Sequence, residues 1–219
     1  MAFCKIVKSF ILGQDTFSSF GPSTPLIEMI NDYDNRIVQL DNYLKETFSI
    51  LEKKGFLDNA IVVITSDHGQ GLGEQGHVGH CISTFPGEIS IPFLLYETGE
   101  NTSIQKVKLP FANQVDIAPT IIDLLKLPKP KTWEGSSIFN EDRPEYIFQH
   151  EDVWYSCIWT DDGVIYQYLF NKKSYAQKVF DLNLPKNKLI NIIDQIDTAM
   201  ITKAKSKLKD FYAIKPPTK

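Results

Sequence analysis

The residues best suited to chemistry gather in one short stretch, which runs from Asp67 to His80. A carboxylate and an imidazole stand side by side at Asp67 and His68, and two further histidines follow at His77 and His80. Carboxylate oxygens and imidazole nitrogens together suit a divalent cation such as Zn²⁺ or Mn²⁺, or Ca²⁺ where more oxygens are present. An imidazole can also donate a hydrogen bond to an anionic ester or a proton to its leaving group. The pattern predicts Asp67 and His68 as metal ligands, and His80 and His77 as catalytic candidates.

A strand must position this stretch, and the residues before it predict one. Residues 60–65, Ala-Ile-Val-Val-Ile-Thr, form an apolar, β-branched run, which is typical of a strand buried on both faces of a parallel sheet. Ligands bind at the carboxyl ends of such strands, where the loop from Ser66 begins. Gly69 is expected to allow an immediate turn, because glycine reaches backbone angles that other residues avoid. Four further glycines are expected to let the loop wrap around a small anion or metal: Gly71, Gly73, Gly76 and Gly79.

A structural interpretation of the same residues is also open, since a carboxylate after a strand often caps a turn or a helix. An Asp-His-Gly triplet alone does not distinguish a metal site from a structural turn or cap. The full string from Thr65 to His80, with its repeated glycines and three histidines, favours the metal site.

The string resembles the metal-site region of a known enzyme family. Residues 59–80, the apolar run 91–96 and the Val-Asp-Ile-Ala-Pro-Thr segment within 115–125 look like the C-terminal half of a sulfatase-family enzyme of the alkaline phosphatase superfamily. Val179-Phe180-Asp181-Leu182, followed by Asn191, resembles the C-terminal signature of that family. The similarity covers nearly the whole chain.

The resemblance implies a sulfuric ester hydrolase with one divalent metal ion, held in part by Asp67 and His68. It also implies an α/β fold: part of a mostly parallel, alkaline-phosphatase-like sheet flanked by helices. The family nucleophile, made from Cys or Ser in a Cys/Ser-x-Pro-x-Arg setting, lies far upstream in the family, and Cys4 lacks those surroundings. We therefore expect an N-terminally truncated fragment without the nucleophile, with an N-terminal half supplied by another chain.

Two other functions remain open on the residues alone. An Asp-His pair with a histidine thirteen residues after the Asp also resembles phosphoethanolamine or phosphoglycerol transferases and phosphodiesterases of the same superfamily. The chain could instead be a non-catalytic remnant that needs a partner chain. The expected substrate is a small-molecule, glycan or lipid ester.

The composition narrows the range of possible binding partners. The 219 residues carry a formal net charge of −4, which argues against nucleic-acid binding, since that needs a cationic surface. No apolar run approaches the roughly 18 residues that span a bilayer. Residues 3–12 are interrupted by two lysines and make a poor signal peptide. The resembled family is often exported or envelope-associated, but the sequence leaves the localisation open. Cys4, Cys81 and Cys157 are scattered and are expected to be free thiols.

The helices and strands before residue 140 are predicted from the spacing of apolar residues and from capping residues. Apolar residues at three- and four-residue spacing predict a helix from about residue 25 to Lys53, packed on a sheet and ended by Gly55. A second strand is expected at 91–96 and a brief one at 107–111. Pro119 is expected to open a helix over 120–125. Asp116 either caps a helix or approaches the active site, and the cap is favoured.

A second pattern begins beyond residue 140. Short aromatic-rich runs predict a small antiparallel sheet with strands at 146–149, 153–160, 164–170 and 178–182. One or two helices are expected within 189–212. The predicted domains are therefore 1–140, the metal-site half of an α/β domain, and 141–219, the small sheet with its helix. The aromatic side chains favour a cross-strand core over a sugar-binding platform: Trp154, Tyr155, Trp159, Tyr166 and Tyr168. His150 is ambiguous.

Overall fold

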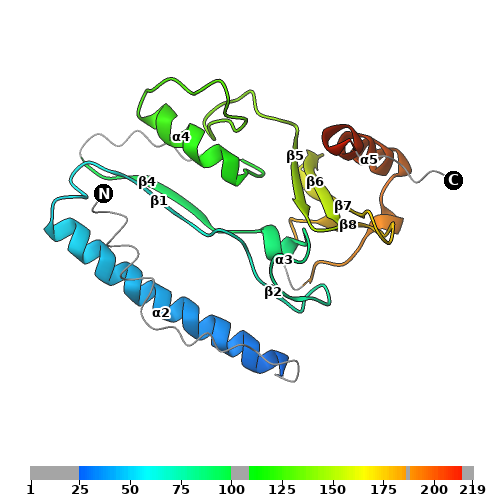
Figure 1. Cartoon of the computed structure of the whole chain (residues 1–219), viewed down its shortest axis with the longest axis horizontal. Helices are drawn as coiled ribbons and strands as arrows, with labels where there is room; N and C mark the ends of the chain where they lie inside the picture. Colours follow the sequence, from blue (N-terminus) through cyan, green and yellow to red (C-terminus); the bar gives the residue numbers. More distant parts are fainter. Residues whose placement is uncertain (1–24, 100–108, 186–187, 214–219) are drawn as a thin grey trace. The chain divides into compact units, whose positions relative to one another are not determined.

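A computed structural model describes residues 25–99, 109–185 and 188–213. The chain divides into two compact units, residues 1–60 with 98–100, and residues 61–97 with 101–219 (Figure 1). Each unit is described by itself below.

The first unit contains the long helix α2, Leu26–Lys53, which confirms the predicted helix. Its carboxyl end is a Schellman turn, because Gly55 N donates to Glu52 O (2.9 Å) and Phe56 N to Leu51 O (3.0 Å). Gly55 has a φ of +73°, a conformation that glycine adopts without strain. Within this unit no residue of α2 is buried, so the expected packing of its apolar stripe on a sheet stays a prediction.

The second unit opens with two strands that pair in opposite directions. β1 (Ile61–Thr65) lies antiparallel to β4 (Phe93–Glu97), and the register places Thr65 opposite Phe93. Both predicted strands exist, but all the strand pairs of the described residues are antiparallel, so the expected parallel pairing is not seen there. The chain between them returns to the end of β1 that it left, which produces the antiparallel pair.

The expectation that these strands are buried on both faces was wrong within this unit. Four residues of β1 are half-buried, while Phe93, Leu94 and Tyr96 of β4 are exposed. Two strands alone do not have enough neighbours to cover both faces.

Between β1 and β4 lie a small hairpin and a single helical turn. β2 (Gly71–Leu72) pairs with β3 (Val78–Gly79), and α3 (Pro86–Ile89) follows. These elements give the glycine-rich loop its shape.

A 3₁₀ turn, η1 (Gln114–Asp116), leads directly into α4 (Ile117–Leu124). The helix begins three residues before the predicted range of 120–125, and Pro119 lies in its first turn, where a missing N–H removes no helical hydrogen bond. The brief strand expected at 107–111 lies partly outside the described residues, and residues 109–111 are not in a strand.

The predicted C-terminal antiparallel sheet is confirmed, with strand order β5-β6-β7-β8. Its strands are β5 (Tyr146–Glu151), β6 (Trp154–Asp161), β7 (Val164–Asn171) and β8 (Gln177–Asp181). The turn between β6 and β7 is Asp162-Gly163, whose φ values of +44° and +78° suit a two-residue hairpin. The chain continues through η3 (Ile193–Gln195) to α5 (Thr198–Tyr212).

The two faces of this sheet have different partners, because alternate residues of a strand point to opposite sides. One face packs on Ala204 and Leu208 of α5 and holds the buried Tyr146, Trp159 and Tyr168. Of the predicted aromatic core residues, Tyr155, Trp159, Tyr166 and Tyr168 lie in this cross-strand core, whereas Trp154 packs on the other face against Phe85. The other face meets Phe85 from the glycine-rich loop region, through the cluster Phe85, Leu169, Phe180 and Leu189.

Candidate functional site

The loop after β1 presents the carboxylate of Asp67 to solvent. Its side chain is 85% exposed, and its Oδ1 accepts a hydrogen bond from His68 N at 2.9 Å. That backbone hydrogen bond is the main cause of a lowered pKa for the Asp67 carboxyl. Ser66 Oγ donates to His68 O at 2.7 Å and tightens the same turn. The exposed Asp67 carboxylate is therefore held in place by hydrogen bonds within its own loop.

His68 is oriented by the next residue. Its Nδ1 lies 2.7 Å from Gly69 O, and because a carbonyl oxygen only accepts, Nδ1 carries the proton in that contact. When His68 is neutral, this leaves its Nε2 as the lone-pair nitrogen, which lies 3.8 Å from Asp67 Oδ2. Two ligands at roughly 2 Å from one cation lie at most about 4 Å apart. A backbone carbonyl on the second imidazole nitrogen is typical of metal-binding histidines. The pair fits a divalent metal.

Gly69 is needed for a different reason from the one expected. Among the described glycines it is not one with a positive φ. Instead, a Cβ at Gly69 would lie 2.3 Å from Gly87 O and 2.9 Å from Glu88 C, because Gly69 N donates to Glu88 O at 2.7 Å. The loop thus passes against the backbone of α3. The conformational freedom expected of Gly69 is found at Gly73, Gly76 and Gly79.

A buried carboxylate, Glu88, fixes the segment beneath the histidines. Glu88 is 4% exposed, and it accepts hydrogen bonds from Ile82 N (3.0 Å), Ser83 N (3.1 Å) and Ser83 Oγ (2.6 Å). Three donors compensate the burial of its charge. Nothing in the sequence singled out Glu88, because its donors come from a loop whose path periodicity does not reveal.

Gln114 ties the metal loop to the next element. Its Nε2 donates to Ser66 O (3.0 Å) and Asp67 O (2.7 Å), across more than forty residues of chain. Since both bonds go to carbonyl oxygens, the amide nitrogen must face the loop. Gln114 therefore holds the backbone at Ser66 and Asp67.

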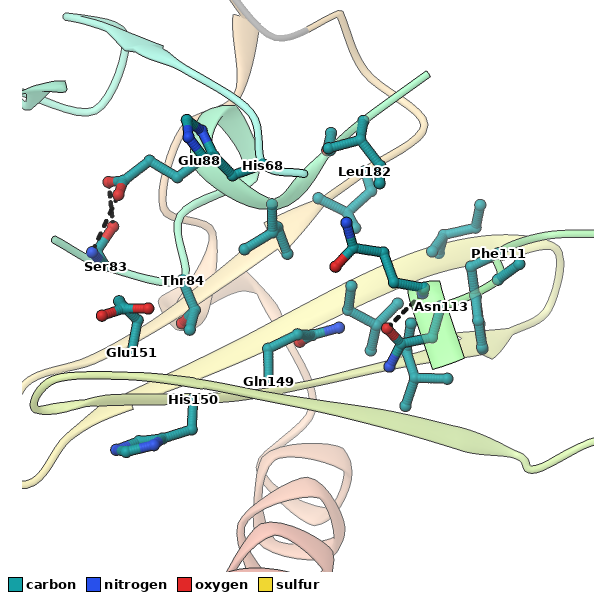
Figure 2. A pocket seen from close by; sticks show the side chains of 18 of the residues that line it. His68, Ser83, Thr84, Glu88, Phe111, Asn113, Gln149, His150, Glu151 and Leu182 are labelled. Atoms are coloured by element: carbon teal, nitrogen blue, oxygen red, sulfur yellow. Dashed lines mark hydrogen bonds between the residues drawn. The ribbon is translucent and has the colours of Figure 1, made fainter. Parts of the chain in front are cut away.

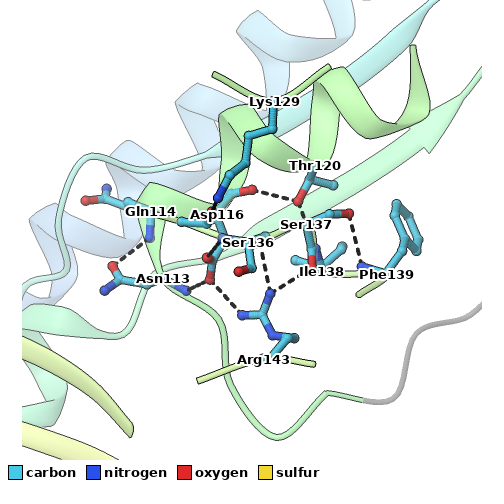
Figure 3. A network of polar contacts seen from close by, with 11 residues as sticks. Asn113, Gln114, Asp116, Thr120, Lys129, Ser136, Ser137, Ile138, Phe139 and Arg143 are labelled. Carbon is cyan, nitrogen blue, oxygen red and sulfur yellow. Dashed lines mark hydrogen bonds and ion pairs between the residues drawn. The ribbon is translucent and has the colours of Figure 1, made fainter. Parts of the chain in front are cut away.

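Behind Gln114 lies a buried ion pair (Figure 3). Asp116 Oδ2 accepts from Arg143 Nη2 at 2.7 Å and from Asn113 N at 2.8 Å, while Oδ1 accepts from Ser136 N at 2.9 Å. Asn113 and Asp116 form a reciprocal capping box around η1. Asp116 precedes α4 as its N-cap residue, but its side chain makes no capping hydrogen bond to that helix; it instead closes the box around η1 and accepts from Ser136 N.

The structure places one of the two catalytic candidates, His80, beside the pair Asp67 and His68. The rings of His68 and His80 stack with centroids 4.0 Å apart and an interplanar angle of 22°. His80 Nδ1 lies 3.4 Å from Cys81 Sγ. His77 instead packs on Phe85, with ring centroids 5.1 Å apart. In the part of the chain that the structure describes, no three His, Cys, Asp or Glu side chains group as a complete metal site.

A cavity of about 500 Å³ extends from the metal pair to the C-terminal sheet (Figure 2). Its lining includes Asp67, His68 and Cys81, and also residues 147 and 149–151 of β5. In Figure 2, Gln149 points from β5 into this space, while His150 points to the opposite side of the strand. The ring of His150 stacks on Tyr155 at 4.3 Å, which makes it part of the aromatic face.

The two described cysteines differ in accessibility, as expected of free thiols in different surroundings. Cys81 is exposed and Cys157 is buried, and burial raises the pKa of the Cys157 thiol to about 12. In a Cys4→Ser background at pH 8, we expect iodoacetamide to alkylate Cys81 and to leave Cys157 intact, because only the thiolate reacts. Peptide mass spectrometry measures both. Equal labelling of both thiols in the folded chain would contradict the packing, and labelling in urea is the control.

Comparison with known proteins assigns the site to a family. The family model described as Sulfatase matches residues 8–127, which is more than half of the chain. The chain belongs to the sulfatase family. The residues matched by the family model include Asp67, His68, His77 and His80.

Individual relatives agree with this assignment. The multifunctional alkaline phosphatase superfamily protein PehA of Trinickia caryophylli is 28% identical over 141 residues, covering 58% of this chain and 27% of the relative. The extracellular sulfatase SULF-1 homolog of Drosophila melanogaster is 34% identical over 99 residues, covering 45% of this chain and 9% of the relative. This sulfatase chain thus spans between about a tenth and a quarter of the length of these relatives.

A solved structure supports the α/β fold. A Bacteroides thetaiotaomicron protein described as a sulfatase superposes with a TM-score of 0.52 and 19% identity, covering 73% of this chain and 39% of that one. The similarity shows the alkaline-phosphatase-like fold. No helix among the described residues of this sulfatase chain is long and apolar enough to cross a membrane.

Proposed function

We propose that Asp67 and His68 bind one divalent metal ion at a site that hydrolyses sulfate esters. The observation that carries the proposal is the pair itself, with Asp67 Oδ2 and His68 Nε2 3.8 Å apart and the His68 tautomer fixed by Gly69 O. Family membership supports the sulfate ester as substrate. When bound, such a metal neutralises charge on the ester oxygens and lowers the pKa of the nucleophile. The oxygen and nitrogen donors suit Zn²⁺ or Mn²⁺, or Ca²⁺ with more oxygens.

The side chains of the chain have separate tasks in this proposal. Asp67 supplies a carboxylate that its loop keeps anionic, and Gln114 holds that loop in place. His80, stacked beside His68, is placed to donate a hydrogen bond to the ester or a proton to its leaving oxygen. His77 is the second candidate for that role.

Further ligands and the nucleophile are proposed to come from outside the described residues. Structural and catalytic zinc sites use at least three protein ligands, and the described residues hold no group of three, only the Asp67 and His68 pair. An N-terminal half, in the same protein or another chain, would supply them, along with parallel strands beside β1 and β4. The proposed domain division is that of residues 1–140 from residues 141–219.

Phosphate esters are the second candidate substrate class. The observation in their favour is the similarity to PehA, which is named as multifunctional within the alkaline phosphatase superfamily. A transferase or phosphodiesterase would use the same metal pair, so the metal site alone does not separate the two classes.

Metal binding tests the ligand assignment directly. We expect the chain to bind Mn²⁺, and Asp67→Ala to weaken binding at least tenfold, because it removes the anionic ligand. Titration calorimetry measures the affinity, and circular dichroism checks that the fold is retained. Asp142→Ala, which also removes an exposed carboxylate, is the matched control. Equal Mn²⁺ affinity in the Asp67→Ala variant would refute the assignment.

Turnover decides the substrate class. The chain, alone and mixed with a candidate N-terminal half, is assayed with 4-nitrophenyl sulfate and bis(4-nitrophenyl) phosphate with and without Ca²⁺, Mn²⁺ or Zn²⁺. Faster metal-dependent hydrolysis of the sulfate supports the proposal, and faster hydrolysis of the phosphate supports the second candidate. Metal binding without turnover in any mixture favours a non-catalytic remnant.

A further inference from the structure

The cavity beside the metal pair has a wall that is chemically unlike the metal loop. Three isoleucines from adjacent strands share the sheet face that looks away from α5, and the backbone register explains this. Ile147 pairs with Ile158, and Ile165 lies on the same face of β7. All three line the cavity, whereas the large aromatic residues Tyr146, Trp159 and Tyr168 lie on the other face against α5. The wall is therefore aliphatic.

Two polar side chains of β5, Gln149 and Glu151, line the cavity beside these isoleucines, and a chain of hydrogen bonds fixes the orientation of Gln149. Gln167 is fully buried, and its Nε2 lies 2.6 Å from Thr84 O, so that end of the amide must be the donor. The same Nε2 donates to Ser156 Oγ at 3.2 Å. Ser156 is also fully buried, and its hydroxyl proton then goes to Gln149 Oε1 at 2.7 Å.

The consequence is a fixed direction for the Gln149 amide. Since its oxygen accepts from Ser156, its NH₂ group is turned away from the sheet, and Figure 2 shows the side chain pointing into the cavity toward Asn113. Gln149 is half-buried and lines the cavity. A donor oriented in this way, on an apolar wall, matches a ligand that is apolar apart from a hydrogen-bond acceptor.

We propose that this cavity binds the organic group of the ester, an uncharged aryl or alkyl group that carries an oxygen acceptor. Ile147, Ile158 and Ile165 contact its apolar part, and Gln149 Nε2 donates to its oxygen. The identity of this ligand rests on the proposed ester hydrolysis. Its place beside the proposed metal site follows because Asp67 and His68 line the same cavity as the three isoleucines. Its volume of about 500 Å³ lies within the range of small-molecule sites.

The wall also indicates what the cavity does not favour. Sugar-binding sites typically present an aromatic face to the ring; here Tyr146, Trp159 and Tyr168 of the sheet pack against α5, and Phe111 lines the cavity from another segment. An aliphatic wall discriminates by apolar contact, and Gln149 adds a preference for an acceptor over a plain hydrocarbon.

Binding of two small probes tests the proposal without any metal or turnover. We titrate the 219-residue chain with 2-acetylnaphthalene, which has one carbonyl acceptor, and with naphthalene, which has none, following probe fluorescence. We expect the ketone to bind about three- to tenfold more tightly, from one hydrogen bond to a neutral donor. Because the titration needs no metal, failure of the proposed hydrolysis would leave this result standing.

Two variants locate the site. Gln149→Glu keeps an acceptor for Ser156 and places an acceptor where the donor was, so we expect the preference for the ketone to disappear. Ile165→Asn should weaken both probes about tenfold by removing apolar contact. Thr160→Asn is the matched control, because Thr160 lies opposite Ile165 in the register but is exposed and does not line the cavity.

The outcomes are decisive in either direction. Loss of the ketone preference in Gln149→Glu, with unchanged affinities in Thr160→Asn, supports the proposal. Absence of binding by the wild-type chain overturns it, as does a ketone preference that survives Gln149→Glu. Equal losses in Ile165→Asn and Thr160→Asn also overturn it, since the apolar contact would then lie elsewhere.

Discussion

Replacing Asp116 with alanine is expected to lower the free energy of unfolding by about 3–5 kcal/mol. The Arg143 side chain is 11% exposed and Asp116 is 7% exposed, so the variant leaves a guanidinium largely buried without its carboxylate. It also removes the acceptor of Asn113 N and Ser136 N. Urea unfolding followed by circular dichroism measures the change as a lower midpoint at an unchanged slope.

Glu145→Ala is the matched control for this prediction. Glu145 pairs with Lys203 at 3.0 Å, but the two side chains are 61% and 58% exposed. An exposed pair contributes little to stability, because water screens it and the long side chains lose freedom. A cost for Asp116→Ala as small as that for Glu145→Ala would show that the network around Asp116 does not hold the fold.

The Asp116 network bears on the proposed metal site through Gln114. Asn113 and Asp116 cap the 3₁₀ turn that carries Gln114, and Gln114 donates to the carbonyl of Asp67. Loosening the turn should therefore weaken Mn²⁺ binding in Asp116→Ala even where the chain is still folded. Asp116 acts in this way as a positioning residue.

Patterns that are local in the sequence predicted the elements of this fold. The apolar run before Ser66, the turn at Asp162-Gly163 and the spacing of apolar residues in α2 each depend on neighbours a few positions away. Strand periodicity, turn chemistry and helix periodicity are such local signals. The C-terminal sheet was therefore predictable almost strand by strand.

Contacts between distant segments could not be predicted in the same way. The direction in which β4 pairs with β1 depends on how twenty-seven intervening residues turn back, since Thr65 lies opposite Phe93. The hydrogen bonds of Gln114 to Ser66 O and Asp67 O also join distant residues. Neither contact produces a periodic signal. The proposal that Asp67 and His68 bind a metal needs no such contact, because the two residues are adjacent in the sequence.

Gly69 shows both a local signal and a long-range contact. The sequence predicted that a glycine is needed there, but it did not predict why. A glycine after Asp-His suggested a turn with unusual backbone angles, yet the constraint is the approach of Gly87 and Glu88. A sequence shows the residue type at a position but not the distance to a backbone eighteen positions away. The two explanations predict different variants to be tolerated.

Gly69→Ala is expected to destabilise the chain by about 3 kcal/mol and to weaken Mn²⁺ binding together with it. The added Cβ would lie 2.3 Å from Gly87 O, and a backbone carbonyl cannot move aside as a flexible side chain would. The loop must shift, which disturbs the hydrogen bond from Gly69 N to Glu88 O and the contact that orients His68. Urea unfolding and titration calorimetry measure the two effects.

Gly87→Ala separates close approach from a general need for glycine in this region. A Cβ at Gly87 would meet its nearest neighbours at 3.5 Å, which is ordinary van der Waals contact, although Gly87 lies on the opposite side of the same close approach. Within α3, alanine also restricts the unfolded chain more than glycine does, so we expect a change of less than about 1 kcal/mol and unaltered Mn²⁺ affinity. If both variants lost stability and metal affinity equally, the whole segment would tolerate no added carbon. If neither lost any, the loop would be free to move away from α3, and the fixed orientation of His68 on which the metal pair depends would have no support.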